Sequence, residues 1–109
     1  MSQFDEFYNL VRSGLVDIAK GDLKQFLQQG KTDANQFLQS LQSDLKAWTK
    51  ALANGDLSKD EFDFLLRGKA DLAEMHALTQ AGIAAVQVQQ FRDALIDLII
   101  NSAFKVFVP

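Results

Sequence analysis

The segment from Ala94 to Val108 restricts the fold of this 109-residue chain more than any other feature, because it is apolar on nearly every side of the helix that it should form. A helix that is hydrophobic all round is covered by something. Either the rest of the chain is organised around this helix, or a second molecule covers it. The apolar residues that surround the helix are Ile96, Ile99, Ile100, Ala103, Phe104 and Phe107.

The N-terminal part of the chain has the pattern of an amphipathic helix over residues 3–28. Ser2 precedes it as an N-cap, and Asp5 is a weak capping-box partner three residues later. Gly21 leaves two alternatives open, a stop or a kink after which the helix resumes. The apolar stripe follows the 3.6-residue helical period, and it contains Phe4, Phe7, Tyr8, Val11, Leu15, Ile18 and Ala19.

A second helix is predicted over residues 33–53, with Thr32 or Asp33 as its N-cap. Asn54 and Gly55 should end it, because both residues tolerate a positive φ. The apolar stripe of this helix alternates steps of four and three residues, as in a coiled-coil seam. The stripe contains Ala34, Leu38, Leu41, Leu45, Trp48 and Leu52.

The third helix is predicted to run unbroken over residues 59–102, beginning at a capping box formed by Ser58 and Glu61. Gly82 is the one candidate break, but the three residues after it offer no N-cap for a further helix. At 1.5 Å per residue, this helix would be about 60 Å long, whereas the second helix would be about 30 Å long.

The sequence therefore predicts an all-α fold, a single helical domain over residues 1–109 in which three main helices form an antiparallel bundle with a long C-terminal helix. Gly68 and Gly82 lie on one face of that long helix, with Met75 midway between them. A glycine inside a helix costs about 0.5–1 kcal/mol relative to alanine, so this pattern indicates close helix packing. Packing within the chain and a dimer crossing both fit it.

The predicted lengths leave the second half of the third helix beyond the reach of the other two helices. Such a segment would expose more apolar surface than soluble monomers usually tolerate. Self-association would cover it, and a twofold homodimer is the default arrangement. The predicted oligomer interface consists of Phe91, Leu95, Ile96, Leu98, Ile99, Ile100 and Phe104.

Composition excludes several classes of protein. The net charge of −3 argues against nucleic acid as a partner, because a phosphate-binding surface needs clustered Lys and Arg. The absence of cysteine excludes disulfides and thiolate metal sites. The first residues do not resemble a secretory signal, and no window reaches the roughly 18 uncharged apolar residues of a membrane span. We therefore expect a cytoplasmic protein.

Candidate catalytic and metal-binding residues are few. His76 is the only histidine, it should lie at the edge of the core, and Glu74 is too close in sequence to share a metal with it. The carboxylates occur at a helix start or on a polar stripe, where solvation and the helix dipole explain them. We therefore expect no enzymatic activity, no cofactor and no metal. The carboxylates are Asp60, Glu61, Asp63, Asp71 and Glu74.

These patterns predict a non-enzymatic interaction or assembly protein that self-associates through its C-terminal helix, with another protein as an alternative partner. A second hypothesis is a membrane-surface-active protein that inserts residues 91–108. Amphipathic membrane helices usually carry several Lys and Arg residues beside the apolar face. This region holds only Arg92 and Lys105 against two Asp residues, which disfavours the membrane hypothesis.

Overall fold

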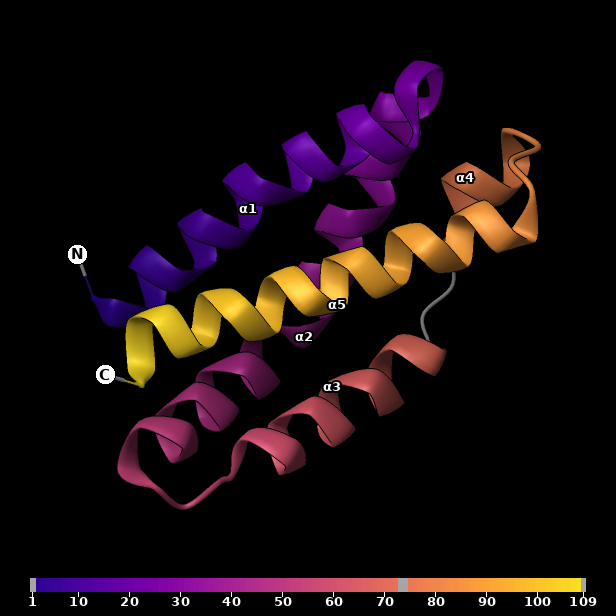
Figure 1. The fold of residues 1–109 in the computed structure, drawn as a ribbon. Helices are drawn as coiled ribbons and strands as arrows, with labels where there is room; N and C mark the ends of the chain where they lie inside the picture. Colours follow the sequence, from indigo (N-terminus) through magenta and orange to yellow (C-terminus); the bar gives the residue numbers. More distant parts are fainter. Residues whose placement is uncertain (1, 73–74, 109) are drawn as a thin grey trace.

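Helices form nearly all of the chain in the structure, a computed structural model that describes residues 2–72 and 75–108 (Figure 1). Within these residues there are five α-helices, one short 3-10 helix and no strand, so the prediction of an all-α fold is confirmed. The elements are α1 (Gln3–Asp22), η1 (Lys24–Phe26), α2 (Leu27–Asn54), α3 (Lys59–Leu72), α4 (His76–Gln80) and α5 (Ala85–Phe107).

The four long helices run in alternating directions, and α5 lies between α1 and α3 with α2 behind it (Figure 1). The most extensive helix contact joins α1 to α5, the first and last long helices of the chain. This antiparallel pair brings the two ends of the chain together, and the Gln3 side-chain amide donates to the Val106 carbonyl over 3.4 Å. The molecule measures 42 × 26 × 19 Å along its principal axes.

The first helix begins as predicted, because the Ser2 hydroxyl accepts from the Asp5 backbone N–H at 3.1 Å. It ends at Asp22 instead of continuing to residue 28. Lys24 then adopts a positive φ of 47°, which turns the chain into η1. Of the two alternatives that Gly21 left open, the stop is the one found.

The second helix begins at Leu27, so the predicted start at residue 33 is wrong. Thr32 is already inside the helix, where its hydroxyl donates to the Gln28 carbonyl at 2.9 Å. The helix ends as predicted, because Gly55 is its C-cap with a φ of 79° in the left-handed region.

The third predicted helix begins correctly but does not run unbroken. The backbone N–H of Ser58 donates to Glu61 Oε1 at 3.0 Å and the N–H of Glu61 donates to Ser58 Oγ at 3.1 Å, which is a complete capping box. However, α3 ends at Leu72, and Gly82 has a φ of 85° in the turn that precedes α5. Three separate helices, α3, α4 and α5, therefore replace the single helix over residues 59–102.

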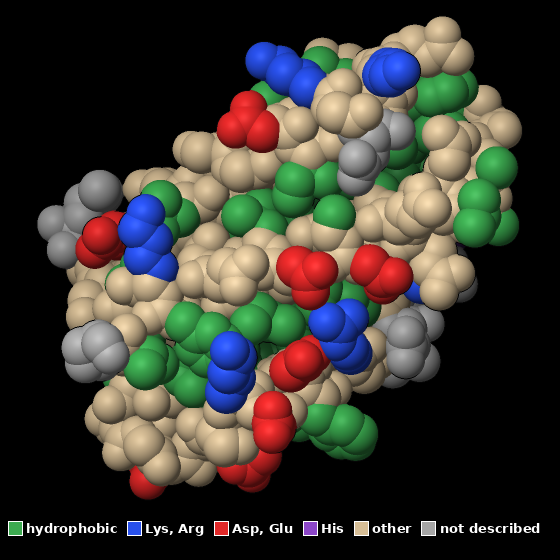
Figure 2. Space-filling model, in the orientation of Figure 1, with side chains coloured by type: hydrophobic (Ala, Val, Ile, Leu, Met, Phe, Trp, Pro, Cys, Tyr) green, Lys and Arg blue, Asp and Glu red, His purple; other side chains and the backbone are tan. Residues whose placement is uncertain are grey.

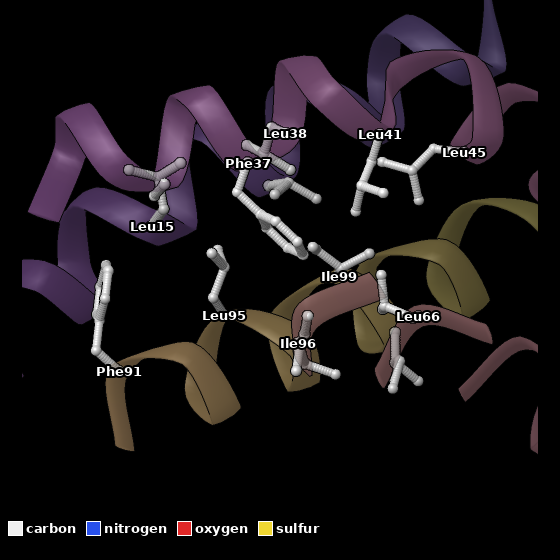
Figure 3. Close-up of a cluster of buried hydrophobic side chains, with 14 of the residues drawn as sticks. Leu15, Phe37, Leu38, Leu41, Leu45, Leu66, Phe91, Leu95, Ile96 and Ile99 are labelled. Atoms are coloured by element: carbon white, nitrogen blue, oxygen red, sulfur yellow. The ribbon is translucent and has the colours of Figure 1, made fainter. Parts of the chain in front are cut away.

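The reversal before α5 folds the apolar C-terminal segment back onto the rest of the chain. Figure 3 shows Leu95, Ile96 and Ile99 of α5 directed toward side chains of α2 and α3. Each Leu, Ile or Phe that is fully buried in this way contributes about 1.5–3 kcal/mol to folding. The largest fully buried side chains are Phe7, Leu15, Leu38, Leu45, Phe62, Leu66, Leu78, Phe91, Leu95, Ile96 and Ile99.

The short helix α4 is held by a residue from α2. The Asp33 side chain is 3% exposed, and its carboxylate accepts from the backbone N–H groups of Ala77 at 3.0 Å and Leu78 at 2.8 Å. The N–H groups at a helix start have no partner within the helix, and negative charge is favourable there. Asp33 therefore caps α4 and not, as predicted, the second helix.

Candidate interaction surface

Most of the predicted oligomer interface is buried inside a single chain. Phe91, Leu95 and Ile99 have no exposed surface, while Ile96 and Ile100 are buried as well. Figure 3 places the first three against side chains of α1 and α2. The premise that the chain is too short to cover its C-terminal helix is therefore wrong. Self-association stays a prediction, but these five residues are not available for it in the folded chain.

Two residues of the predicted interface, Leu98 and Phe104, are half-buried. Leu98 packs on α1, where a Cβ added to Gly14 would lie 2.6 Å from Leu98 Cδ1. The Phe104 ring contacts the Phe62 ring with a centroid separation of 6.2 Å, and Lys59 Nζ lies 5.0 Å from the Phe104 centroid. Phe104 lies near the C-terminal end of α5 and is the predicted interface residue that also lines a surface hollow.

The predicted close packing at Gly68 and Gly82 is also wrong. A Cβ added to either glycine would meet nothing within 4 Å, and Gly82 serves the turn through its positive φ. Met75 is buried, but as the residue before α4 and not as part of a helix crossing. Close approach occurs instead at Gly14 and at Gly30, where an added Cβ would collide with the Leu23 side chain.

Among the candidate polar residues whose side chains the structure describes, His76, Asp60 and Glu61 lie at the surface. His76 is exposed at the start of α4, and not at the edge of the core as predicted. Hydrogen bonds from the Ser58 backbone N–H and from its side chain lower the pKa of Glu61, whereas a general acid needs a raised one. In the part of the chain that the structure describes, no group of three or more His, Cys, Asp or Glu residues could hold a metal ion. The side chains of Asp71 and Glu74 lie outside the described residues.

An exposed apolar surface lies where the α2–α3 turn meets the end of α5. We call it the Phe64 surface, because the Phe64 side chain is 78% exposed and is the most exposed large hydrophobic residue of the described chain. Val108, at the end of α5, is 43% exposed. The apolar residues of the Phe64 surface are Leu52, Leu57, Phe64, Leu65, Phe104 and Val108.

Two shallow hollows share Leu57 as a common wall on the Phe64 surface. The first, of about 370 Å³, is lined by Leu52, Leu57, Lys59, Phe104 and Val108, and we call it the Phe104 hollow. The second, of about 430 Å³, is lined by Leu57, Asp60, Glu61, Phe64 and Leu65. The first hollow therefore has a positive charge among its lining residues, and the second has two negative charges.

Side chains of both charge signs lie along α3 on the surface of the molecule. Figure 2 shows hydrophobic side chains gathered between α5 and α3, with Lys, Arg, Asp and Glu side chains along α3 beside them. Part of this charge is used within the chain, because Arg67 of α3 bonds to Asp63 of its own helix and to Asp97 of α5 at 3.2 Å. Lys59 and Asp60 lie at the first turn of α3, and neither is a partner in these two ion pairs.

The sequence prediction missed Phe64, although a signal was present. Phe62 and Leu66 are four residues apart on one face of the helix, and both are fully buried. Phe64 lies two residues from each, so at 100° per residue it is on the opposite face. An aromatic residue opposite a buried stripe indicates an exposed ring. Phe64 is not among the candidate interface residues predicted from the sequence.

Comparison of the chain with protein-family models, with curated proteins and with solved structures found no match. In the described residues, none of the helices combines the length and apolar character needed to cross a membrane. Insertion of residues 91–108 into a lipid surface would require α5 to leave its contacts with α1, because Phe91, Leu95 and Ile99 are fully buried. The geometry of the Phe64 surface is therefore the basis for the functional conclusion.

Proposed function

We propose that this chain is a non-enzymatic helical interaction protein that binds a protein partner through the Phe64 surface. The observation that carries the proposal is the 78% exposed Phe64 side chain, which lines one hollow and is separated by Leu57 from a second, mainly apolar one. An exposed apolar patch with a charged rim is typical of protein interaction sites. Aromatic side chains often supply most of the binding energy at such sites.

The helices support the Phe64 surface rigidly. Phe62 and Leu66, on the reverse side of α3, are fully buried in the core, and the capping box of Ser58 and Glu61 fixes the first turn. Trp48 of α2 packs edge-on against Phe62 with a centroid separation of 6.4 Å. The backbone that carries Phe64 is thus already ordered, so covering the ring costs only the rotamer freedom of the side chain itself.

Site-specific photocrosslinking in the native cells tests the proposal. A benzophenone side chain in place of Phe64 should give a discrete protein adduct. The matched control carries the same group in place of Gln36, which is exposed on α2 about 27 Å along the helix from Asn54. The control should give no adduct of that mass. Absence of any adduct specific to position 64 would contradict the proposal.

A further inference from the structure

We infer that the partner at the Phe64 surface is a second copy of this chain, bound through a twofold contact. In this contact, Phe64 of each copy enters the Phe104 hollow of the other. The inference rests on the proposed function, because it names the occupant of the same surface. It differs from the interface predicted from the sequence, since the fully buried residues of α5 take no part in it.

The first argument is that the surface carries both halves of a contact. Phe64 projects from α3 with 78% of its side chain exposed, and the Phe104 hollow beside it has mainly apolar walls in Leu52, Leu57, Phe104 and Val108. A twofold axis places the same patch of both copies face to face. The projecting side chain and the hollow that accepts it must therefore both belong to that patch. Phe64 lines the second hollow, which shares Leu57 with the Phe104 hollow, so the ring and the hollow that would receive it lie on adjoining parts of the surface.

The second argument is charge complementarity. Asp60 and Phe64 are four residues apart, so they lie on one face of α3 about one turn from each other. Lys59 lines the Phe104 hollow, with its Nζ over the Phe104 ring. When Phe64 of one copy occupies the Phe104 hollow of the other, Asp60 comes within about one helical turn of the partner's Lys59. The twofold axis repeats this pairing in the opposite direction.

The charges that line the two hollows disfavour a partner whose charges are all of one sign. A basic peptide would match Asp60 and Glu61 but would bring positive charge to Lys59. An acidic peptide would match Lys59 and oppose the two carboxylates. A suitable partner needs an apolar side chain with charges of both signs about one turn away from it. The start of α3 presents this combination itself, in Phe64, Asp60 and Lys59.

Two charge-reversal variants test the inference with the full-length chain. Lys59→Asp places two acids opposite each other in both contacts, and Asp60→Lys places two cations opposite each other. Each variant alone should dimerise about tenfold more weakly than the wild type, because like charges are brought together. An equimolar mixture of the two variants should recover the dimer as a heterodimer. In that heterodimer, one copy has acids at positions 59 and 60 and the other has cations at both, so each contact pairs opposite charges.

Sedimentation velocity from about 10 to 300 µM measures the dimer, and native mass spectrometry of the mixture identifies the heterodimer. Phe64→Ser should weaken the dimer roughly 30-fold, as expected for an aromatic anchor. Lys20→Asp, which changes an exposed residue at the last turn of α1, is the matched control and should dimerise like the wild type. Circular dichroism checks that every variant is folded.

The possible results separate this inference from the proposed function. A wild-type chain that is monomeric at about 300 µM, with a position-64 adduct to a different protein, overturns self-association and leaves the Phe64 surface as an interaction site. A dimer that Phe64→Ser does not weaken, or a mixture that forms no heterodimer, overturns the contact inferred here. A position-64 adduct of twice the chain mass together with heterodimer recovery supports both.

Discussion

Asp33 Oδ2 accepts a hydrogen bond from the Leu78 backbone N–H at 2.8 Å, and this contact joins α2 to a helix that follows 45 residues later. Asp33 Oδ1 accepts from Ala77 in the same way. The cap of α4 therefore comes from another helix, since Met75, at the N-cap position, makes no side-chain hydrogen bond to it. The place of α4 determines where α5 can begin, so one buried carboxylate helps to fix the direction of the C-terminal helix.

Asp33→Ala should lower the free energy of unfolding by about 2–3 kcal/mol, because it leaves the buried N–H of Leu78 and the partly buried N–H of Ala77 without an acceptor. Asp33→Asn keeps one carbonyl acceptor and should cost less. Urea unfolding followed by circular dichroism measures both. Asp17→Ala, at an exposed position of α1, is the control and should change stability by less than about 0.5 kcal/mol. Equal losses in the Asp33 and Asp17 variants would show that the cap has no energetic role.

The sequence predicted those features of the fold that nearby residues determine. Ser2 and the Ser58–Glu61 pair begin helices, and Gly55 ends one, because each contact spans only a few residues. The buried stripe of the second helix was also predicted correctly, except that Trp48 is half-buried.

The break before α5 escaped prediction because its determinants are distant in sequence. Asp33 resembles a local N-cap, and only the folded chain reveals that it caps α4 instead. The lack of an N-cap after Gly82 favours a continuous helix, yet α5 begins after Ala84 without a side-chain cap. The spacing of apolar residues does not predict the break either, because α3 and α5 pack into the same core and both need an apolar face.

The two glycines of the supposed long helix should respond in opposite ways to alanine. Gly68→Ala should stabilise the protein by about 0.5–1 kcal/mol, because the position is helical, exposed and free of neighbours within 4 Å. Gly82→Ala should destabilise it by about 1 kcal/mol, because a φ of 85° is strained for any residue with a Cβ. Thermal and urea unfolding measure both variants. Stabilisation by both would instead favour a continuous helix through Gly82.

The capping box of α3 should make stability depend on pH in the acidic range. Hydrogen bonds from Ser58 lower the pKa of Glu61 from its ordinary value of 4.5. The stability that the ionised Glu61 carboxylate contributes is therefore fully present above pH 4.5 and is lost as the pH falls through the lowered pKa. Glu61→Gln retains a neutral acceptor and should lack that dependence. The difference in melting temperature between wild type and variant should therefore shrink from pH 7 to pH 3. A difference that is the same at both pH values would exclude the carboxylate as its source.

Substitution of Ile99 tests whether this side chain is buried within its own chain or against a second copy. Ile99→Ala should lower the free energy of unfolding by about 2–5 kcal/mol at every protein concentration, because the side chain is fully buried among residues of its own chain. Val86→Ala, at a 63% exposed position of the same helix, is the control and should change stability by less than about 0.5 kcal/mol. Urea unfolding at about 5 and 200 µM measures both variants. A loss that appears only at the higher concentration would mean that Ile99 contacts a second molecule, and the position of α5 against α1 and α2 would then be wrong.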